Sequence, residues 1–94
     1  MVYLLDTNII IRFLIRDNEE LFEISKNYFL KIERLELKAE ILPSVLMEAF
    51  FVLTKFYKLN KKEVILDLKT LLSLDGIVNS DKIISYEALS IMEN

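Results

Sequence analysis

Short apolar runs alternate along the chain with longer stretches in which apolar residues recur every three or four positions. The first run, residues 1–5, has the length and composition of a strand that is buried on both faces of a parallel sheet. Residues 40–42 and 77–79 form two further apolar segments, which we expect to be short strands. Between these three segments, apolar residues recur at the spacing of a helix, so we expect helices there. The pattern therefore predicts an α/β fold in which helical crossovers join the strands of a short parallel sheet.

A polar break separates the first two expected helices. The first helix covers residues 8–15, and Asp17 follows it with Glu20 at the spacing of a capping box. We expect Asp17 to begin a second helix that runs to about residue 37. The apolar residues that keep helical steps, and that we expect on its buried face, are Leu21, Ile24, Tyr28, Ile32 and Leu35.

Three more helices are expected after the second strand. The third covers residues 44–57 and is apolar over most of its length. Asn60 and Glu63 repeat the capping spacing for the fourth, and the polar residues 80–81 can cap the last. The fourth is expected to bury Val64, Ile65, Leu68, Leu71 and Leu72, and the last to bury Ile84, Ala88, Leu89, Ile91 and Met92.

Composition limits the chemistry that is available. A chain of 94 residues with 53% hydrophobic and 29% charged residues indicates one folded domain. It contains no cysteine and no histidine, which excludes disulfides, thiolate metal sites, imidazole acid–base chemistry and Ser-His triads. Carboxylates remain as metal ligands, and oxygen ligands favour a hard cation such as Mg²⁺ or Mn²⁺.

Charge and hydropathy bear on partners and location. A formal net charge of -3 argues against nucleic-acid binding through overall basicity, although a local basic patch stays compatible with it. The first apolar run lacks a basic flank and is interrupted by Asp6, so we do not expect a signal peptide. No apolar run approaches the length of a bilayer span. We therefore expect a cytoplasmic protein with no membrane partner.

Asp6 stands at the carboxyl end of the first predicted strand. Ligands of open α/β sheets bind in the crevice beyond this end of the strands. A carboxylate between two apolar runs is costly to bury unless its charge is compensated. Asp6 is therefore either the cap of the first helix, accepting hydrogen bonds from its first turn, or a metal ligand.

Glu48 is the second acid embedded in apolar sequence. On the third predicted helix it shares a face with Val45, Phe51 and Val52, so we expect its carboxylate in or beside the core. Taken alone, an acid near a helix N-terminus is explained by the helix dipole. Because Glu48 can reach the same sheet edge as Asp6, a cation shared by the two acids is the favoured explanation.

These residues carry a resemblance to a known family. The chain resembles the PIN domain of VapC-type toxins in a series of short motifs. They are Leu5-Asp6-Thr7-Asn8, then Arg12, and then Pro43 and Glu48 before a long apolar helix. The resemblance covers the whole chain and implies a three-layer sandwich with a short parallel sheet flanked by helices. It also implies a ribonuclease that depends on Mg²⁺ or Mn²⁺, with RNA as substrate and an antitoxin protein as partner.

The resemblance implies a role for each matching residue. Asp6 would bind the metal directly, and Glu48 would be a ligand or would hold a metal-bound water. Thr7 and Asn8 would position Asp6 or a substrate phosphate through hydrogen bonds. Arg12 would meet a phosphate or an inhibitor carboxylate, since guanidinium suits both, unless it is an ordinary surface charge.

The chain departs from the family pattern at its C-terminal end. Family members continue into a further helix and strand that supply more acids, so we expect a PIN domain that is C-terminally truncated, its last strand missing. Asp81 and Glu87 are expected on a solvated face and not as ligands. A missing strand would leave a sheet edge and apolar surface open. We therefore expect association with another copy, with elements exchanged between copies, or completion by a separate chain.

Two other functions stay open at this point. One is a non-catalytic PIN remnant that holds an antitoxin peptide in a groove between its apolar helices or serves as an oligomerising module. The other is a phosphatase or phosphoacceptor that uses Asp6 as its nucleophile. The second is disfavoured because position 8 is Asn, where such phosphatases carry a second acid.

Overall fold

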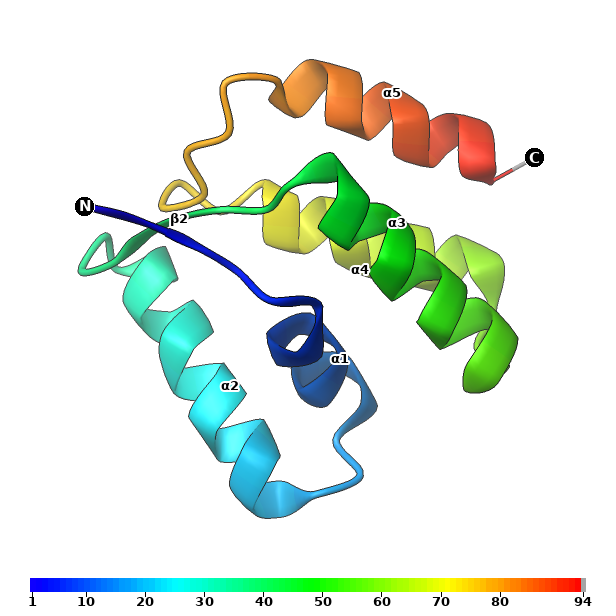
Figure 1. The fold of residues 1–94 in the computed structure, drawn as a ribbon, viewed down its shortest axis with the longest axis horizontal. Helices are drawn as coiled ribbons and strands as arrows, with labels where there is room; N and C mark the ends of the chain where they lie inside the picture. The colour runs from blue at the N-terminus through cyan, green and yellow to red at the C-terminus, as the bar shows by residue number, and fades with distance from the viewer. Residues whose placement is uncertain (94) are drawn as a thin grey trace.

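The first two strands and the helices follow one another in the predicted order, but the third predicted helix changes to a π-helix after Phe51 and the third predicted strand is not formed (Figure 1). The structure is a computed structural model and describes residues 1–93. Its elements are β1 (Val2–Leu4), α1 (Thr7–Ile15), α2 (Glu19–Glu33), β2 (Lys38–Glu40), α3 (Pro43–Phe51), the π-helix η1 (Val52–Phe56), α4 (Lys61–Leu72) and α5 (Lys82–Met92). α1 packs on α2, α3 and α5 pack on α4, and contacts between α1 and α3 join the two groups (Figure 1).

The sheet is parallel, as predicted, and β2 is its central strand. β1 pairs with β2 in a register that places Tyr3 opposite Ala39. On the other edge of β2, the N–H of Ala39 donates to Gly76 and the N–H of Val78 donates to Ala39, both at 2.8 Å. The expected strand at 77–79 is thus a single parallel bridge between Ala39 and Ile77. β2 itself begins two residues before the predicted position.

β1 lies at an edge of the sheet, which corrects the expectation that it is buried on both faces. All three of its residues are exposed, Leu4 to 63%. The reason is its neighbours: β2 is paired on both sides, whereas β1 is paired within the described chain on one side alone. An apolar strand of this kind is an open edge for pairing with another chain.

The core confirms the predicted face of α4 and corrects that of α2. Val64, Ile65, Leu68, Leu71 and Leu72 are all buried. In α2, however, Ile24 and Tyr28 are exposed, and Phe29 is buried in their place. The ring of Phe13 on α1 stacks on Phe22 and packs against Phe29, at centroid distances of 5.7 and 4.8 Å. These aromatic contacts turn α2 by about one residue from the expected face.

The ends of α2 also differ from the prediction. Asn18, and not Asp17, is the N-cap, because its side chain accepts the N–H of Leu21 at 3.0 Å. The helix ends at Glu33, four residues earlier than expected. Leu35 takes a left-handed backbone conformation with φ of 63°, and the N–H of the following residue donates to the Lys31 carbonyl, which closes the last turn.

α5 presents only part of its predicted face to the core: Leu89 is buried and Met92 packs against the core, as expected. Ser85 is also buried, whereas Ile84, Ala88 and Ile91 are exposed. The orientation follows from contacts with α4, where the Tyr86 hydroxyl donates to the Lys69 carbonyl at 3.2 Å. Glu87 lies on the exposed face, as expected. Across residues 1–93, none of the helices has both the length and the apolar character that crossing a bilayer requires.

Candidate functional site

Asp6 caps α1 at the carboxyl end of β1. Leu5 continues the ladder by donating its N–H to Glu40 at 3.0 Å, and the chain then turns into the helix. Asp6 has extended backbone angles, and its Oδ1 accepts the N–H of Asn8 at 3.2 Å. Its side chain is exposed, so its charge carries no large burial cost. The capping role is therefore confirmed, and it occupies one of the two carboxylate oxygens.

Thr7 connects this strand end to α3. It is buried, and its hydroxyl donates a hydrogen bond of 3.2 Å to Oε2 of Glu48, 41 residues further along the chain. Glu48 is exposed, so its carboxylate does not lie in the core, but it lies beside the core in contact with the buried Thr7. α3 buries Leu46 and Phe50, which turns Glu48 outward at the margin facing α1. The first-strand motif and the helix acid nevertheless meet, through Thr7.

Asn8 and Arg12 lie on the exposed surface of α1. Asn8 contributes its backbone N–H to the cap described above. Arg16 forms an ion pair with Glu19 at 3.1 Å, whereas within residues 1–93 the Arg12 guanidinium has no hydrogen bond or ion pair. The structure thus brings Thr7 and Glu48 into contact, whereas no hydrogen bond or ion pair joins the side chains of Asn8 or Arg12 to Glu48 in residues 1–93.

Asn79 is a site-supporting residue that the sequence argument missed. It is 7% exposed, and its side-chain amide accepts the N–H of Ile41 at 2.9 Å and donates to the Ile41 carbonyl at 2.6 Å. The Asn79 amide thus satisfies the backbone N–H and C=O of Ile41, which a neighbouring strand would otherwise bind, at the point where the chain passes from β2 to α3. The signal available in the sequence was a polar residue at the end of an apolar run, which has to be satisfied if it is buried.

Asp6 and Glu48 supply too few oxygen atoms to fill the coordination shell of a hard cation, so water molecules would have to complete it. Asp6 and Glu48 each use one carboxylate oxygen in the bonds described and keep the other for a ligand. Residues 1–93 hold no group of three or more acidic side chains placed to bind a metal ion. Mg²⁺ commonly keeps several waters and takes one or two carboxylates, so a two-acid site suits it better than Ca²⁺.

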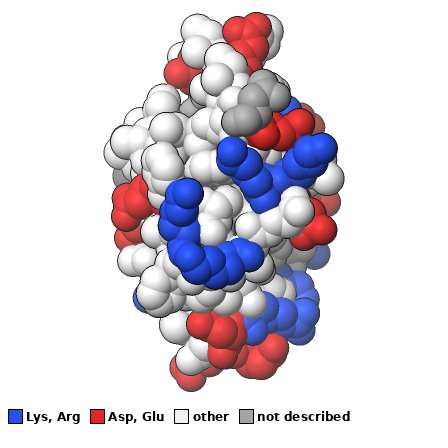
Figure 2. Space-filling view, turned by 90° about the vertical axis from the view of Figure 1, so that its right-hand side faces the viewer, with Lys and Arg blue, Asp and Glu red and all other residues white. Residues whose placement is uncertain are grey.

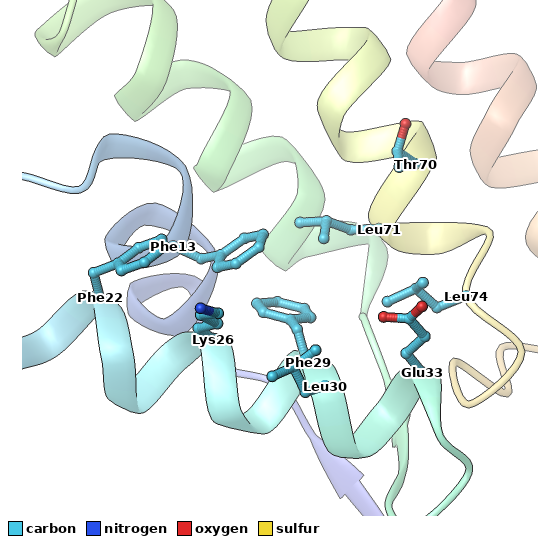
Figure 3. A pocket seen from close by; sticks show the side chains of 9 residues that line it. All are labelled: Phe13, Phe22, Lys26, Phe29, Leu30, Glu33, Thr70, Leu71 and Leu74. Carbon is cyan, nitrogen blue, oxygen red and sulfur yellow. The ribbon is translucent and has the colours of Figure 1, made fainter.

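A second feature is an apolar hollow between α1, α2 and α4, with a volume of about 360 Å³ (Figure 3). Phe13, Phe22 and Phe29 form its aromatic wall, and the side chains of Leu71 and Leu74 close it from the α4 side (Figure 3). Lys26, Glu33 and Thr70 also line it. None of the residues around Asp6 and Glu48 lines this hollow, so it is a separate feature.

Comparison with known proteins gives no match. No protein-family model matches the sequence, and neither does any curated protein or solved structure. The features that bear on function are therefore the capped strand end, the bond between Thr7 and Glu48, and the apolar hollow.

Proposed function

We propose that the chain is a PIN-like, metal-dependent ribonuclease of the toxin–antitoxin type. The observation that supports it is the hydrogen bond of 3.2 Å from Thr7 to Glu48, which brings the Leu5–Asn8 motif to the acid of α3. The α/β architecture with a parallel sheet agrees with a PIN-like three-layer sandwich. The exposed edge of β1 suits association with a second copy or completion by another chain.

The proposed roles follow from the atoms that stay available. Asp6 and Glu48 each offer one carboxylate oxygen to Mg²⁺ or Mn²⁺. Thr7 fixes the orientation of Glu48, because a buried hydroxyl that donates to one oxygen restricts rotation of the carboxylate. Asn8 and Arg12 present an amide and a guanidinium one turn apart at exposed positions of α1, where they can contact substrate phosphates.

The cation, when bound, would lower the pKa of a water molecule and neutralise charge that develops on the phosphodiester. The protein's own contribution is to hold one acid at the end of β1 and the other in the second half of α3. Because both acids are exposed, a phosphate group can approach them without opening the core. Hydrolysis of an RNA phosphodiester is the reaction that this arrangement suits.

The test is cleavage of a labelled RNA panel by the chain in Mg²⁺ or Mn²⁺. The proposal expects cleavage that is lost with chelator and in Asp6→Asn and Glu48→Gln. Asp17→Asn is the matched control, because Asp17 is an exposed acid away from the site. Cleavage that survives in both site variants would refute the proposal, and so would the absence of cleavage in the unmodified chain.

The apolar hollow supports a second candidate, a non-catalytic module that binds an antitoxin peptide. Apolar grooves between helices commonly take one face of an amphipathic helix. Lys26 and Glu33 lie on the same helix beside the hollow, about 10 Å apart along its axis. A peptide with an acid and a base two turns apart would match both charges.

The second candidate is tested with helical peptides selected by phage display on the unmodified chain. Thr70 lines the hollow but is itself exposed, so Thr70→Arg narrows the hollow without disturbing the core. Loss of peptide binding in this variant, with binding kept in the control Ser73→Arg, supports the module. Peptides that bind both variants equally would show that the hollow is not their site.

A further inference from the structure

A basic turn lies at the end of the molecule where α3 and η1 lead into α4 (Figure 1). Lys55, Lys58, Lys61 and Lys62 are all exposed and supply four of the 12 basic residues of an otherwise acidic chain. No acidic residue occurs between Glu48 and Glu63. Figure 2 looks onto this end and shows blue side chains gathered near its middle, with red ones toward the margins. Basic charge is thus concentrated locally.

Aromatic side chains accompany the lysines. Phe56 is 75% exposed, and its ring packs edge-on against Tyr57 at a centroid distance of 5.0 Å. Phe51, 48% exposed, lines a hollow of about 360 Å³ beside the turn. The other residues that line this hollow are Phe50, Thr54, Lys55, Leu59, Lys61 and Met92. Exposed rings that are flanked by cations are the combination used to bind single-stranded nucleic acid.

The backbone of the turn is unusual at two positions. Val52–Phe56 is a π-helix, in which the N–H of Tyr57 donates to the Val52 carbonyl at 3.1 Å. Lys58 follows in a left-handed conformation with φ of 59°. Both conformations are rare for ordinary residues, and both concentrate at functional sites. Here they keep Phe56 and the lysines on the surface while Leu53 remains fully buried.

We propose that this turn binds single-stranded RNA, with Lys55, Lys58 and Lys62 contacting backbone phosphates and Phe56 stacking on an unpaired base. A single strand fits better than a duplex, because the bases of a duplex are not free to stack on a protein ring. It also fits better than a membrane surface, because the turn offers one prominent ring and a discrete hollow where a membrane-binding helix would offer a broad apolar face.

The position of the turn deepens the proposed ribonuclease function, on which this inference rests for the choice of RNA. Lys55 lies two helical turns beyond Glu48 on the continuous helix formed by α3 and η1, about 10 Å along the axis. A strand that is held at the lysines can therefore extend along α3 to the two acids. The turn would hold the substrate, and the acids would act on it.

Binding is measured with chelator present, by fluorescence anisotropy of a labelled single-stranded RNA of about 10 nucleotides. The lysine variant carries Lys55→Gln, Lys58→Gln and Lys62→Gln. The control variant carries Lys31→Gln, Arg34→Gln and Lys38→Gln, which change the net charge equally at exposed positions elsewhere. Phe56→Ala tests stacking, and Phe56→Trp is its conservative counterpart. Thermal unfolding verifies that each variant is folded.

We expect the lysine variant to lose affinity at least about tenfold and to reduce the slope of log affinity against log salt by about 2. Phe56→Ala is expected to lose at least about fivefold with an unchanged slope, and Phe56→Trp to restore binding. Equal losses in the control variant, no loss in the lysine variant, or no binding by the unmodified chain would overturn the proposal. It would also be overturned if the lysine variant lost binding to phosphatidylserine vesicles and kept RNA binding.

The two proposals fail in different ways. Binding that depends on the turn, without any cleavage in Mg²⁺ or Mn²⁺, would uphold the RNA site and refute the ribonuclease. Cleavage that depends on Asp6, with equal binding by the lysine and control variants, would uphold the ribonuclease and refute the RNA site.

Discussion

Replacing Asn79 with alanine should destabilise the protein strongly. The change removes two hydrogen bonds, of 2.9 and 2.6 Å, and leaves the N–H and C=O of Ile41 without partners. Ile41 is 0% exposed, so water cannot replace the lost amide without opening the structure. At about 1–3 kcal/mol for each of the two unsatisfied groups, the free energy of unfolding should fall by about 2–6 kcal/mol.

Urea unfolding, followed by far-ultraviolet circular dichroism, measures this change. Asn27→Ala is the control, because Asn27 is exposed on α2 and should alter stability by no more than about 0.5 kcal/mol. Asn79→Asp should also destabilise at neutral pH, because the buried carboxylate cannot donate to the Ile41 carbonyl. Its stability should recover as the pH is lowered and the carboxyl group takes up a proton. A loss below about 1 kcal/mol in Asn79→Ala would refute the argument from buried backbone groups.

Three further changes have defined outcomes. Gly76→Ala should lower the free energy of unfolding by about 1–3 kcal/mol in the same assay, because a Cβ there would meet the Ile32 carbonyl oxygen; a neutral result would contradict the close approach. Partial desolvation of the carboxyl group and the nearby charge of Glu63 raise the pKa of Asp67, so stability should fall as the pH rises from the ordinary pKa of an aspartate through the raised one. Asp67→Asn should remove this part of the pH dependence and increase stability at pH 7, and an unchanged pH profile would exclude the effect. Leu4→Thr should reduce self-association in sedimentation experiments, whereas unchanged association would place the contact elsewhere.

Local signals in the sequence predicted the elements well. The face of α4 was predicted in full, because Val64, Leu68, Leu71 and their neighbours follow one strict helical period. Asn60 caps α4 as its spacing indicated, with its side chain accepting the N–H of Glu63 at 3.1 Å. The parallel pairing also followed, since helices separate the strands.

Features that depend on distant contacts were not predictable in this way. The apolar composition of β1 indicates a strand, but it does not state how many neighbours the strand has. The third helix is apolar around most of its circumference, so periodicity could not choose which face of it holds Glu48. The exposed position of Glu48 is set by the burial of Leu46 and Phe50 against other elements.

The sequence proposed residues for the candidate site but could not give its geometry. Asp6, Thr7 and Glu48 were selected from short motifs, and the bond that joins the last two spans 41 residues. A pattern of neighbouring residues cannot predict a contact between residues so far apart in the sequence. Asn79 was missed for the same reason, because its partner Ile41 lies 38 residues earlier in the chain.

Binding of Mn²⁺ tests most directly whether Asp6 and Glu48 share a cation. Isothermal titration calorimetry of the unmodified chain should show a site, and Asp6→Asn and Glu48→Gln should each weaken it at least about tenfold. The double variant should lose little more than either single variant, because both remove the same site. Glu63→Gln, a change at another exposed acid in the first turn of a helix, should leave the affinity unchanged. Equal Mn²⁺ affinity in the unmodified chain and in both single variants would contradict the shared site.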